Sequence, residues 1–389
     1  MARVGIIGCG QTAFGRRSDA TVQELAFEAW RAALDDAGVE PDVVEATVVG
    51  SVPEYHKQRS LPGVIQEYLN LNPRPVWLTE AACASGSAAL RTAWLEIAAG
   101  VHDVVAVIGC QKMTELETAE ILALMGRVGD VQWESGFGTT FPGYYAMFAR
   151  RHMHEFGTTS DQLAAVAVKN HHYGAANPKA MFRKEITVAK ARASEEVSAP
   201  LSVYDCCANA DGAACVILAG ERAARALGKD RVVWLDGMGC ASDSMSVLRR
   251  SDLTGLPSAR AAAAQAYAMA GVTAKDIQVA DVHDCFTIAE IMAYEDLGFC
   301  GRGEGGAFID ARGSYIGGAH PVNLDGGLKA KGHPIGATGV SMTCEIVSQL
   351  RGECGARQVP GARVALHENG GGIWGIEEAA AHVGIYGRA

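Results

Sequence analysis

Apolar runs of strand length alternate along the chain with alanine-rich stretches whose apolar residues recur with a helical period. Residues 25–39 predict an amphipathic helix, and VVEATVVG at 43–50 predicts a buried strand. Buried strands that alternate with helices are typical of α/β proteins whose sheets are covered on both faces. The pattern therefore predicts an α/β fold.

This succession of elements occurs twice. A second alanine-rich helix, predicted at 259–272, ends at Ala-Gly-Val as the helix at 25–39 does, and a strand-like segment follows each helix. Small residues, a helix and a strand then follow one another over 83–110 and again over 333–371. Chance similarity between alanine-rich helices is the alternative. Three successive elements agree in order and spacing, however, and this favours an internal repeat.

We interpret the chain as two similar halves, 1–220 and 231–389. The segment from about 111 to 200 breaks the repeat and is rich in aromatic residues and glycine. We expect it to be an inserted loop domain that covers one end of the sheets, where a substrate would lie.

Composition narrows the class of protein. The 389 residues are 49% hydrophobic, enough for a large core, and the net charge of −10 argues against nucleic acid or an anionic membrane as the main partner. The N-terminal segment has no apolar stretch of signal-peptide or membrane-spanning length, which predicts a soluble, cytoplasmic protein. The eleven cysteines include no CxxC pair, so we expect most of them to be reduced core thiols.

Two helix starts carry candidate chemistry. Cys83 precedes a predicted helix among small residues, and the unsatisfied amides of a helix N-terminus favour a thiolate, which is the nucleophilic form. His333, in GHPIGATG, occupies the matching place in the second half, before a proline suited to a first helical turn. A histidine there can take a proton from a thiol or donate to an oxyanion. The alternative for Cys83 is a buried core thiol.

Two further motifs follow predicted strands of the second half. In VHDCFT (282–287), His283 and Cys285 are two residues apart, so on an extended segment they point the same way, while Asp284 points opposite and anchors the loop. HENGGG (367–372) predicts a glycine-rich turn whose amides can hold an oxyanion. A buried Cys285 and an ordinary loop are the respective alternatives.

Together these motifs resemble the thiolase superfamily, in particular its sterol-carrier-protein-type and archaeal acetoacetyl-CoA thiolase branch. The resemblance covers essentially the whole chain and rests on ACASGSAAL, VYDCCANADGAA, HDCFTIAE, GHPIGATG and the closing glycine run. It implies the thiolase fold, with two pseudo-symmetric βαβαβαββ halves in a five-layer α-β-α-β-α arrangement and an inserted loop domain. It also implies a homodimer or tetramer.

The resemblance implies a role for each motif. Cys83 would carry an acyl group, and His333 would activate it. Cys285 would replace the second cysteine of classical thiolases, which is absent here, and His283 stands where the classical branch has asparagine. Such an enzyme cleaves or forms a 3-ketoacyl-CoA, uses coenzyme A as a substrate, and needs no bound cofactor and no metal.

Two oxyanion holes are implied as well. One would use His333 with a water held by His283, and the other the amides of Cys83 and of the Gly370–Gly371 turn, beside Asn369. Glu368 departs from the His-Asn that related chains have at 367–368. Because a carboxylate facing the site would oppose negative charge, we expect Glu368 to point away or to contact substrate or a neighbour.

Several alternatives remain open. A thiolase-fold retro-aldolase tends to lack the nucleophilic cysteine, a ketosynthase pairs one cysteine with two histidines, and a non-catalytic acyl-CoA or lipid carrier is expected to have lost one of these groups. No strongly basic segment supplies an obvious site for the CoA phosphates. A small partner protein with an OB fold and zinc ribbon is therefore a further hypothesis. The acyl chain and the physiological direction stay open.

Overall fold

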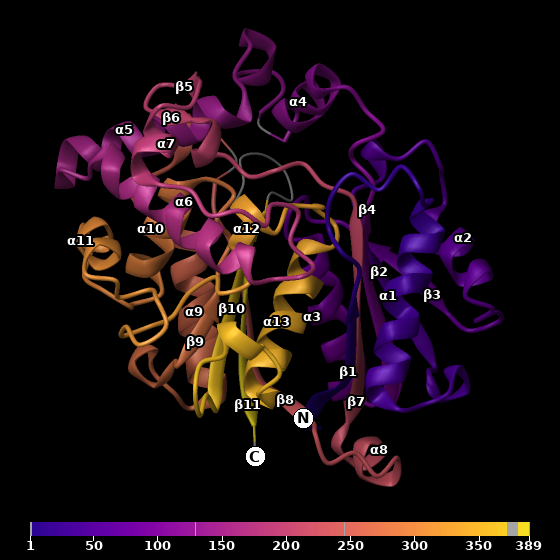
Figure 1. Ribbon diagram of the computed structural model, residues 1–389. Coiled ribbons are helices and arrows are strands. Elements are labelled where there is room, and N and C mark those ends of the chain that lie inside the picture. Colours follow the sequence, from indigo (N-terminus) through magenta and orange to yellow (C-terminus); the bar gives the residue numbers. More distant parts are fainter. Residues whose placement is uncertain (1, 129, 245, 372–379, 389) are drawn as a thin grey trace.

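Nine strands form one mixed sheet in the computed structural model, which describes residues 2–128, 130–244, 246–371 and 380–388. Their order is β3-β2-β4-β7-β1-β8-β11-β10-β9 (Figure 1). The strands are β1 (Val4–Gln11), β2 (Ala46–Gly50), β3 (Val76–Thr79), β4 (Val104–Gln111), β7 (Gly212–Gly220), β8 (Val233–Ser242), β9 (Val279–Asp281), β10 (Val364–Gly371) and β11 (Ala380–Arg388).

The first half follows the predicted βαβαβαββ order. Helices α1 (Val22–Ala37), α2 (Leu61–Tyr68) and α3 (Ser85–Ala98) connect β1 to β4, and β7 closes the half after the insertion. α1 forms where predicted: Thr21 and Glu24 make a reciprocal capping box at its start, and Gly38 ends it in the left-handed conformation with φ 60°.

The second half repeats this path with one strand fewer among the described residues. β8, α9 (Pro257–Ala270), β9, α13 (Thr338–Arg351), β10 and β11 follow in order, and α9 ends at the predicted glycine, Gly271, with φ 67°. Where the first half has β3 beside β2, the second half has a single parallel bridge from Val322 to Ala280 on β9. Residues 311–320, just before Val322, form turns and bends instead of a strand.

The elements stack in the predicted five layers. α1 packs on β1, β4 and β7, and α9 packs on β8 and β11, so these helices form the outer layers. α3 and α13 pack on each other in the middle, and α13 contacts strands of both halves (Figure 1). The two sheet layers are joined at one edge, where Gly5 and Ile6 of β1 pair with Trp234 and Val233 of β8.

The central helices approach each other at two glycines, each the second residue of its helix. A Cβ on Gly86 would lie 3.0 Å from the backbone nitrogen of Gly339, and one on Gly339 would lie 2.5 Å from that of Ser87. Gly339 therefore serves close packing, and so does Gly336, where a Cβ would lie 2.6 Å from Cys110 O on β4. In GHPIGATG only Gly332, with φ 104°, has the left-handed conformation that a tight glycine turn requires.

The insertion between β4 and β7 lies over the second half. It contains α4 (Thr118–Gly126), α5 (Phe141–Phe156), α6 (Ser160–Ala175), α7 (Val188–Arg192), β5 (Glu196–Ser198) and β6 (Leu201–Ser202). Tyr145 on α5 stacks on Phe286 with ring centroids 4.4 Å apart. α6 packs on α10 (Thr287–Asp296), α11 (Gly305–Asp310) and α12 (Gly327–Ala330). The insertion thus reaches the HDCF segment (Figure 1).

The remaining helix, α8 (Glu221–Ala226), connects the two halves. Over the described residues, no helix combines the length and apolar character needed to cross a membrane.

Candidate active site

Cys83 lies in a strained turn between β3 and α3. Ala82 before it has φ 47°, a left-handed conformation that alanine rarely adopts. The turn is held by side chains: Ala82 N donates to Glu80 Oε1 at 2.6 Å, and Ser85 Oγ donates to Ala82 O at 2.5 Å. Cys83 is 4% exposed and stands two residues before the first residue of α3. Strain of this kind is kept where a side chain must be aimed.

His333 reaches the same place from a loop, not from a helix start. α13 begins only at Thr338, so the prediction that Pro334 lies in the first helical turn is wrong. Because His333 stands five residues before its helix and Cys83 two, their places in the repeat are not equivalent. The backbone of His333 is fixed by donation from its N–H to Ala208 O at 2.8 Å.

His283 follows β9 in a buried loop rather than on an extended strand. Its N–H donates to Glu368 Oε2 at 3.0 Å, so Glu368 contacts a neighbour, as expected. Asp284 anchors the loop as predicted: its carboxylate accepts from Leu328 N and from Asn170 Nδ2, each at 2.7 Å. The first contact comes from α12 and the second from α6 of the insertion.

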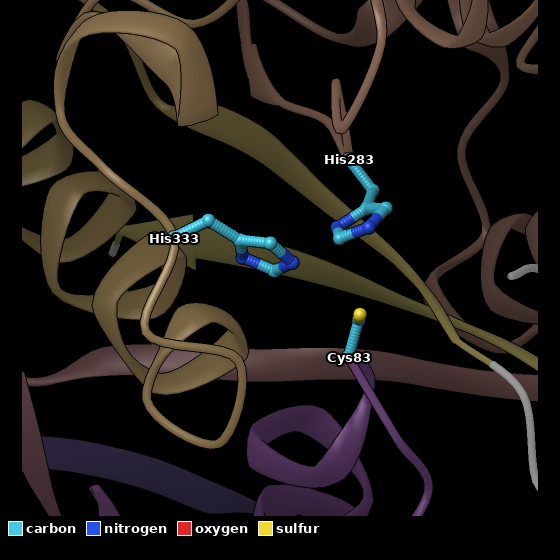
Figure 2. Close-up of side chains that lie close together, drawn as sticks. All are labelled: Cys83, His283 and His333. Carbon is cyan, nitrogen blue, oxygen red and sulfur yellow. The ribbon is translucent and has the colours of Figure 1, made fainter. Parts of the chain in front are cut away.

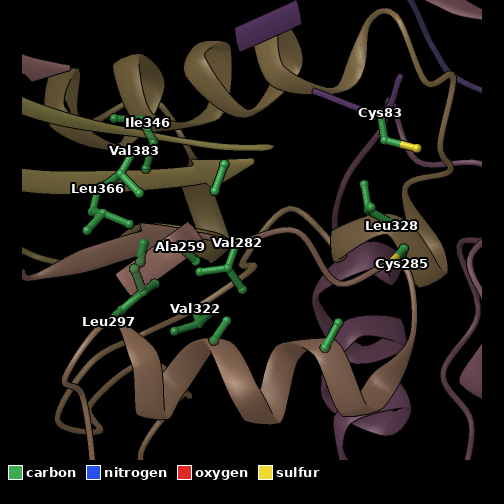
Figure 3. Packing of buried hydrophobic residues seen from close by; sticks show 14 of the residues in the cluster. Cys83, Ala259, Val282, Cys285, Leu297, Val322, Leu328, Ile346, Leu366 and Val383 are labelled. Atoms are coloured by element: carbon green, nitrogen blue, oxygen red, sulfur yellow. The ribbon is translucent and has the colours of Figure 1, made fainter. Parts of the chain in front are cut away.

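These segments bring one thiol and two imidazoles together. The Sγ of Cys83 and a ring nitrogen of each of His283 and His333 lie within 4.8 Å of one another, and the ring centroids are 5.2 Å apart (Figure 2). Cys285 does not belong to this group. It is fully buried, and in Figure 3 Leu328 lies between it and Cys83.

Asn369 determines which nitrogen of His283 carries the proton. Its Nδ2 donates to the carbonyl oxygen of Cys83 at 3.2 Å, which fixes the orientation of the amide, and lies 3.2 Å from Nδ1 of His283. An amide nitrogen only donates, so Nδ1 must accept. Neutral His283 therefore carries its proton on Nε2 and is a donor toward the site.

Thr338 gives His333 the opposite arrangement. The hydroxyl of Thr338 donates to Pro334 O at 3.2 Å, and its oxygen lies 2.7 Å from Nδ1 of His333. With the hydroxyl proton used, Nδ1 of His333 is the donor. Neutral His333 then has its lone pair on Nε2 and can take a proton.

A hydrogen-bond chain supports Asn369 from the core. Tyr386 O–H donates to Nδ1 of His367 at 2.6 Å, Nε2 of His367 lies 3.0 Å from Ser87 Oγ, and Ser87 donates to Oδ1 of Asn369 at 2.9 Å. Burial lowers the pKa of His367 to about 3, so its ring stays neutral and the chain keeps one direction. Our sequence reasoning missed Ser87, His367 and Tyr386. The serine in CASGS and the histidine that opens HENGG were the available signals.

The predicted glycine turn is wrong over 367–371. These residues form the end of β10, where Gly370 pairs with Ala381 and Gly371 with Ala380. Gly372 lies outside the described residues. A Cβ on Gly371 would lie 2.3 Å from Ala84 N, so glycine here allows β10 to touch the start of α3.

The thiol and two imidazoles could also hold a metal ion. A metal needs a lone pair on His283, but Nδ1 accepts from Asn369 and Nε2 then carries the proton. Ligation would therefore require the amide of Asn369 to turn away from Cys83 O. The observed hydrogen bonds suit proton transfer better.

A cavity of about 560 Å³ adjoins these loops. It is lined by Cys207 and Ala208, whose backbones hold Cys285 and His333: Cys207 N donates to Cys285 O at 2.8 Å. The wall also holds four cationic side chains, Arg183, Lys184, Lys190 and Lys329. Three of them lie on the insertion and its following loop. These three lie within eight residues of one another, between 183 and 190, and the fold adds Lys329 from α12.

Two family models match the chain. The thiolase N-terminal domain covers residues 4–222, and the thiolase C-terminal domain-like model covers 239–386. The chain belongs to the thiolase family. This thiolase is an acyltransferase, and it is 42% identical to the acetyl-CoA acetyltransferase of Methanothermobacter thermautotrophicus, over 98% of this chain and 99% of the relative.

One further likeness agrees with the predicted branch, and another is to an aldolase. The thiolase is 32% identical to human sterol carrier protein 2, over 95% of this chain and 70% of that protein. Among solved structures, a chain of the Ltp2-ChsH2(DUF35) aldolase superimposes with a TM-score of 0.85 at 28% identity, over 99% of this chain and 98% of that one.

Proposed function

We propose that this thiolase makes or cleaves a short 3-ketoacyl-CoA, as an acetyl-CoA acetyltransferase, through an acyl group carried on Cys83. The proposal rests on one observation: a buried thiol faces two imidazoles whose neutral forms are a proton acceptor, His333, and a proton donor, His283. The similarity to the Methanothermobacter acetyltransferase supports acetyl-CoA as the substrate.

In the degradative direction, Nε2 of His333 takes the Sγ proton, and the thiolate attacks the 3-keto carbon. The developing oxyanion accepts a hydrogen bond from Nε2–H of His283. The carbon–carbon bond then breaks, and its electron pair leaves on the acetyl-CoA enolate, which is protonated at carbon. Free CoA takes the acyl group from Cys83 and restores the thiol. Synthesis is the reverse sequence.

Cys285 is our candidate for the proton donor to the enolate carbon. It is buried, and its carbonyl oxygen accepts a hydrogen bond from the N–H of Cys207, which lines the cavity. It lies outside the close group of Cys83 and the two histidines. A single thiol with two histidines also matches the residue set of a ketosynthase. The Cys285→Ala variant separates these possibilities: it should still be acylated on Cys83 but should fail at carbon–carbon bond exchange.

The test of the central claim is intact-mass analysis after incubation with acetyl-CoA. The wild type should gain one acetyl group, and Cys83→Ala should gain none. Acylation that persists in Cys83→Ala would refute the role of Cys83. Cys300→Ala, a half-exposed thiol elsewhere, is the matched control and should be acylated like the wild type.

A retro-aldolase is the second candidate, because the solved structure with a TM-score of 0.85 is named an aldolase. An aldolase does not form an acyl-enzyme. Acetyl transfer to Cys83 followed by transfer to CoA would therefore exclude it, and cleavage of a side-chain acyl-CoA by Cys83→Ala would favour it. The non-catalytic carrier predicts neither reaction.

We further propose that coenzyme A enters by the cationic cavity, that the protein is a cytoplasmic homodimer or tetramer, and that a small partner assists CoA binding. The cations at 183, 184 and 190 suit the CoA phosphates.

β3 is a half-exposed edge strand, which suits pairing with a second copy. The matched aldolase is named as a complex of Ltp2 with ChsH2(DUF35). Light scattering of the purified chain tests the oligomer.

A further inference from the structure

A second cavity, of about 440 Å³, contains none of the residues of the Cys83 site. Three of the eleven cysteines line it: Cys9, Cys344 and Cys354. Lys179 and Lys331 line it too. The proposed reaction uses none of these thiols, so it does not explain why three cysteines line one cavity.

Cys9 and Cys344 lie on two elements that are already in contact. Cys9 is on β1 and Cys344 on α13, and the Sγ of Cys344 donates to Gly10 O at 3.6 Å. One turn earlier on α13, Ser341 Oγ donates to Gln11 Oε1 at 3.0 Å. The strand and helix are therefore in register around the two thiols.

The two thiols also differ in acidity. A hydrogen bond from Cys9 is the largest influence that lowers the pKa of Cys344, and Lys179 and Lys331 lower it further. The same hydrogen bond, together with burial, raises the pKa of Cys9. Cys344 therefore forms a thiolate more readily, whereas Cys9 stays protonated until a later step. Reactive cysteine pairs are divided in this way.

We propose that Cys9 and Cys344 form a dithiol that hydrogen peroxide oxidises to an intramolecular disulfide. The Cys344 thiolate attacks one peroxide oxygen, the O–O bond breaks, and Cys344 becomes a sulfenic acid as water leaves. The Cys9 sulfur then attacks the Cys344 sulfur, the S–O bond breaks and a second water leaves. Two thiols lose two electrons and two protons, and one peroxide becomes two waters.

The disulfide would join β1 to α13 without rearranging the Cys83 site. β1 is the first element of the chain and α13 the last α-helix, so the cross-link closes a loop of most of the chain. Such cross-links restrict the unfolded chain and raise stability if the native geometry accepts them. We therefore expect oxidation to raise the thermal midpoint, reversibly with dithiothreitol, while acetyl transfer from Cys83 is kept.

The test uses the full chain with Cys83→Ala, so that the nucleophile does not consume peroxide. After brief treatment with equimolar hydrogen peroxide, alkylation and trypsin, mass spectrometry should find peptides 4–16 and 332–351 joined, because each contains a single cysteine. Cys9→Ser should abolish this cross-link and leave Cys344 as a sulfenic acid that dimedone traps.

Cys354→Ser is the matched control, since this thiol lines the same cavity, and it should leave the cross-link unchanged. Peroxide that gives no joined 4–16 and 332–351 peptides, or that joins Cys344 to Cys354 instead, would overturn the proposal. Failure of Cys83 to accept an acetyl group would leave this outcome unaffected, so the two proposals fail separately.

Discussion

At the scale of single residues, the site is defined by where two protons are held. Thr338 leaves Nε2 of His333 with a lone pair, and Asn369 leaves Nε2 of His283 with a proton. A ring nitrogen of each histidine lies within 4.8 Å of one thiol sulfur, and acceptance and donation are assigned before substrate arrives. The hydrogen-bonding partners of the rings, rather than the rings themselves, make the two histidines different.

Asn369→Asp tests this assignment. The carboxylate accepts where the amide donated, so His283 should move its proton to Nδ1 and lose its donor toward the oxyanion. We expect kcat to fall about 100-fold or more, a loss typical of one missing oxyanion donor. ¹⁵N NMR of the His283 ring should show the exchanged tautomer. An unchanged tautomer with unchanged kcat would contradict the role given to Asn369.

The motifs predicted which residues meet but not how they are held. Cys83, His283 and His333 were all candidates, and the structure brings them together; their catalytic roles stay predictions. The places of Ser87, His367 and Thr338 could not be read from spacing, because each acts through a partner from a distant segment. Cys285 was expected to point the same way as His283 because an extended segment was assumed, and its catalytic role rested on the resemblance.

At the scale of elements, the insertion supports the HDCF loop as well as covering it. Lys169 and Asn170 of α6 bind Glu290 of α10, and Asn170 also binds Asp284. Lys329 of α12 donates to the carbonyl of Asp284. The buried ion network thus links three elements behind His283 and Cys285.

Asn170→Leu should loosen this loop without touching the reacting atoms. Loss of a buried hydrogen-bond donor costs about 1–3 kcal/mol, which urea unfolding would measure. We expect kcat for carbon–carbon bond exchange to fall about tenfold, while the extent of Cys83 acylation in intact mass is unchanged. Equal losses in both would place Asn170 in support of Cys83 instead.

Gly339→Ala tests the crossing of α3 and α13. The new Cβ would meet Ser87 Oγ at 2.2 Å and Asn369 Oδ1 at 2.4 Å, so both must move. Overpacking of this kind costs about 1–3 kcal/mol, and the displaced Asn369 should lower kcat. Gly63→Ala is the control: nothing lies within 4 Å of its Cβ, and stability and kcat should not fall. A fully active Gly339→Ala enzyme would show that the crossing tolerates separation.

The pattern of apolar residues predicted most elements, but not their exceptions. α1 and α9 end at the predicted glycines because the left-handed cap is a local property. The absence of a third strand in the second half was not predicted. Val322 makes a single bridge, to Ala280 on β9, and this pairing depends on tertiary packing rather than on the local sequence. The 367–371 segment was taken for a turn because glycine-rich strands have no local signature. The boundaries at 220 and 231 stay a prediction.

At the scale of the whole molecule, buried neutral histidines make stability depend on pH. Burial lowers the pKa of His367 to about 3, from an ordinary value of 6.5. Below pH 6.5 the unfolded chain takes up a proton that the folded chain refuses, so stability is lost as pH falls from 6.5 toward 3. At pH 5 this one group should cost about 2 kcal/mol.

Urea unfolding at pH 7.5 and pH 5 measures this loss. His367→Gln should be less stable at pH 7.5 but should show a smaller decrease between the two values than the wild type. Carboxylates contribute to the pH dependence of stability in both proteins. The difference between their two decreases in unfolding free energy therefore isolates the contribution of His367. Equal decreases in the wild type and in His367→Gln would contradict the lowered pKa of His367.

Coenzyme A affinity is also a property of the assembled molecule. Arg183, Lys184 and Lys190 line one cavity of the folded chain, and Lys190→Ala should raise KM for acetyl-CoA several-fold with little change in kcat, as expected for uniform binding. If the isolated chain already binds CoA with full affinity, the small partner is unnecessary.

The meeting of Gly86 and Gly339 has a historical consequence. If both halves descend from one repeated unit, an ancestral pair of identical units would have met itself at this point, and a single inherited glycine would have protected both sides. Once the copies were fused, glycine was required separately at position 86 and at position 339, because a side chain on either helix would clash with the other helix. The halves could then diverge into a nucleophile on one side and a base on the other only while both glycines were kept.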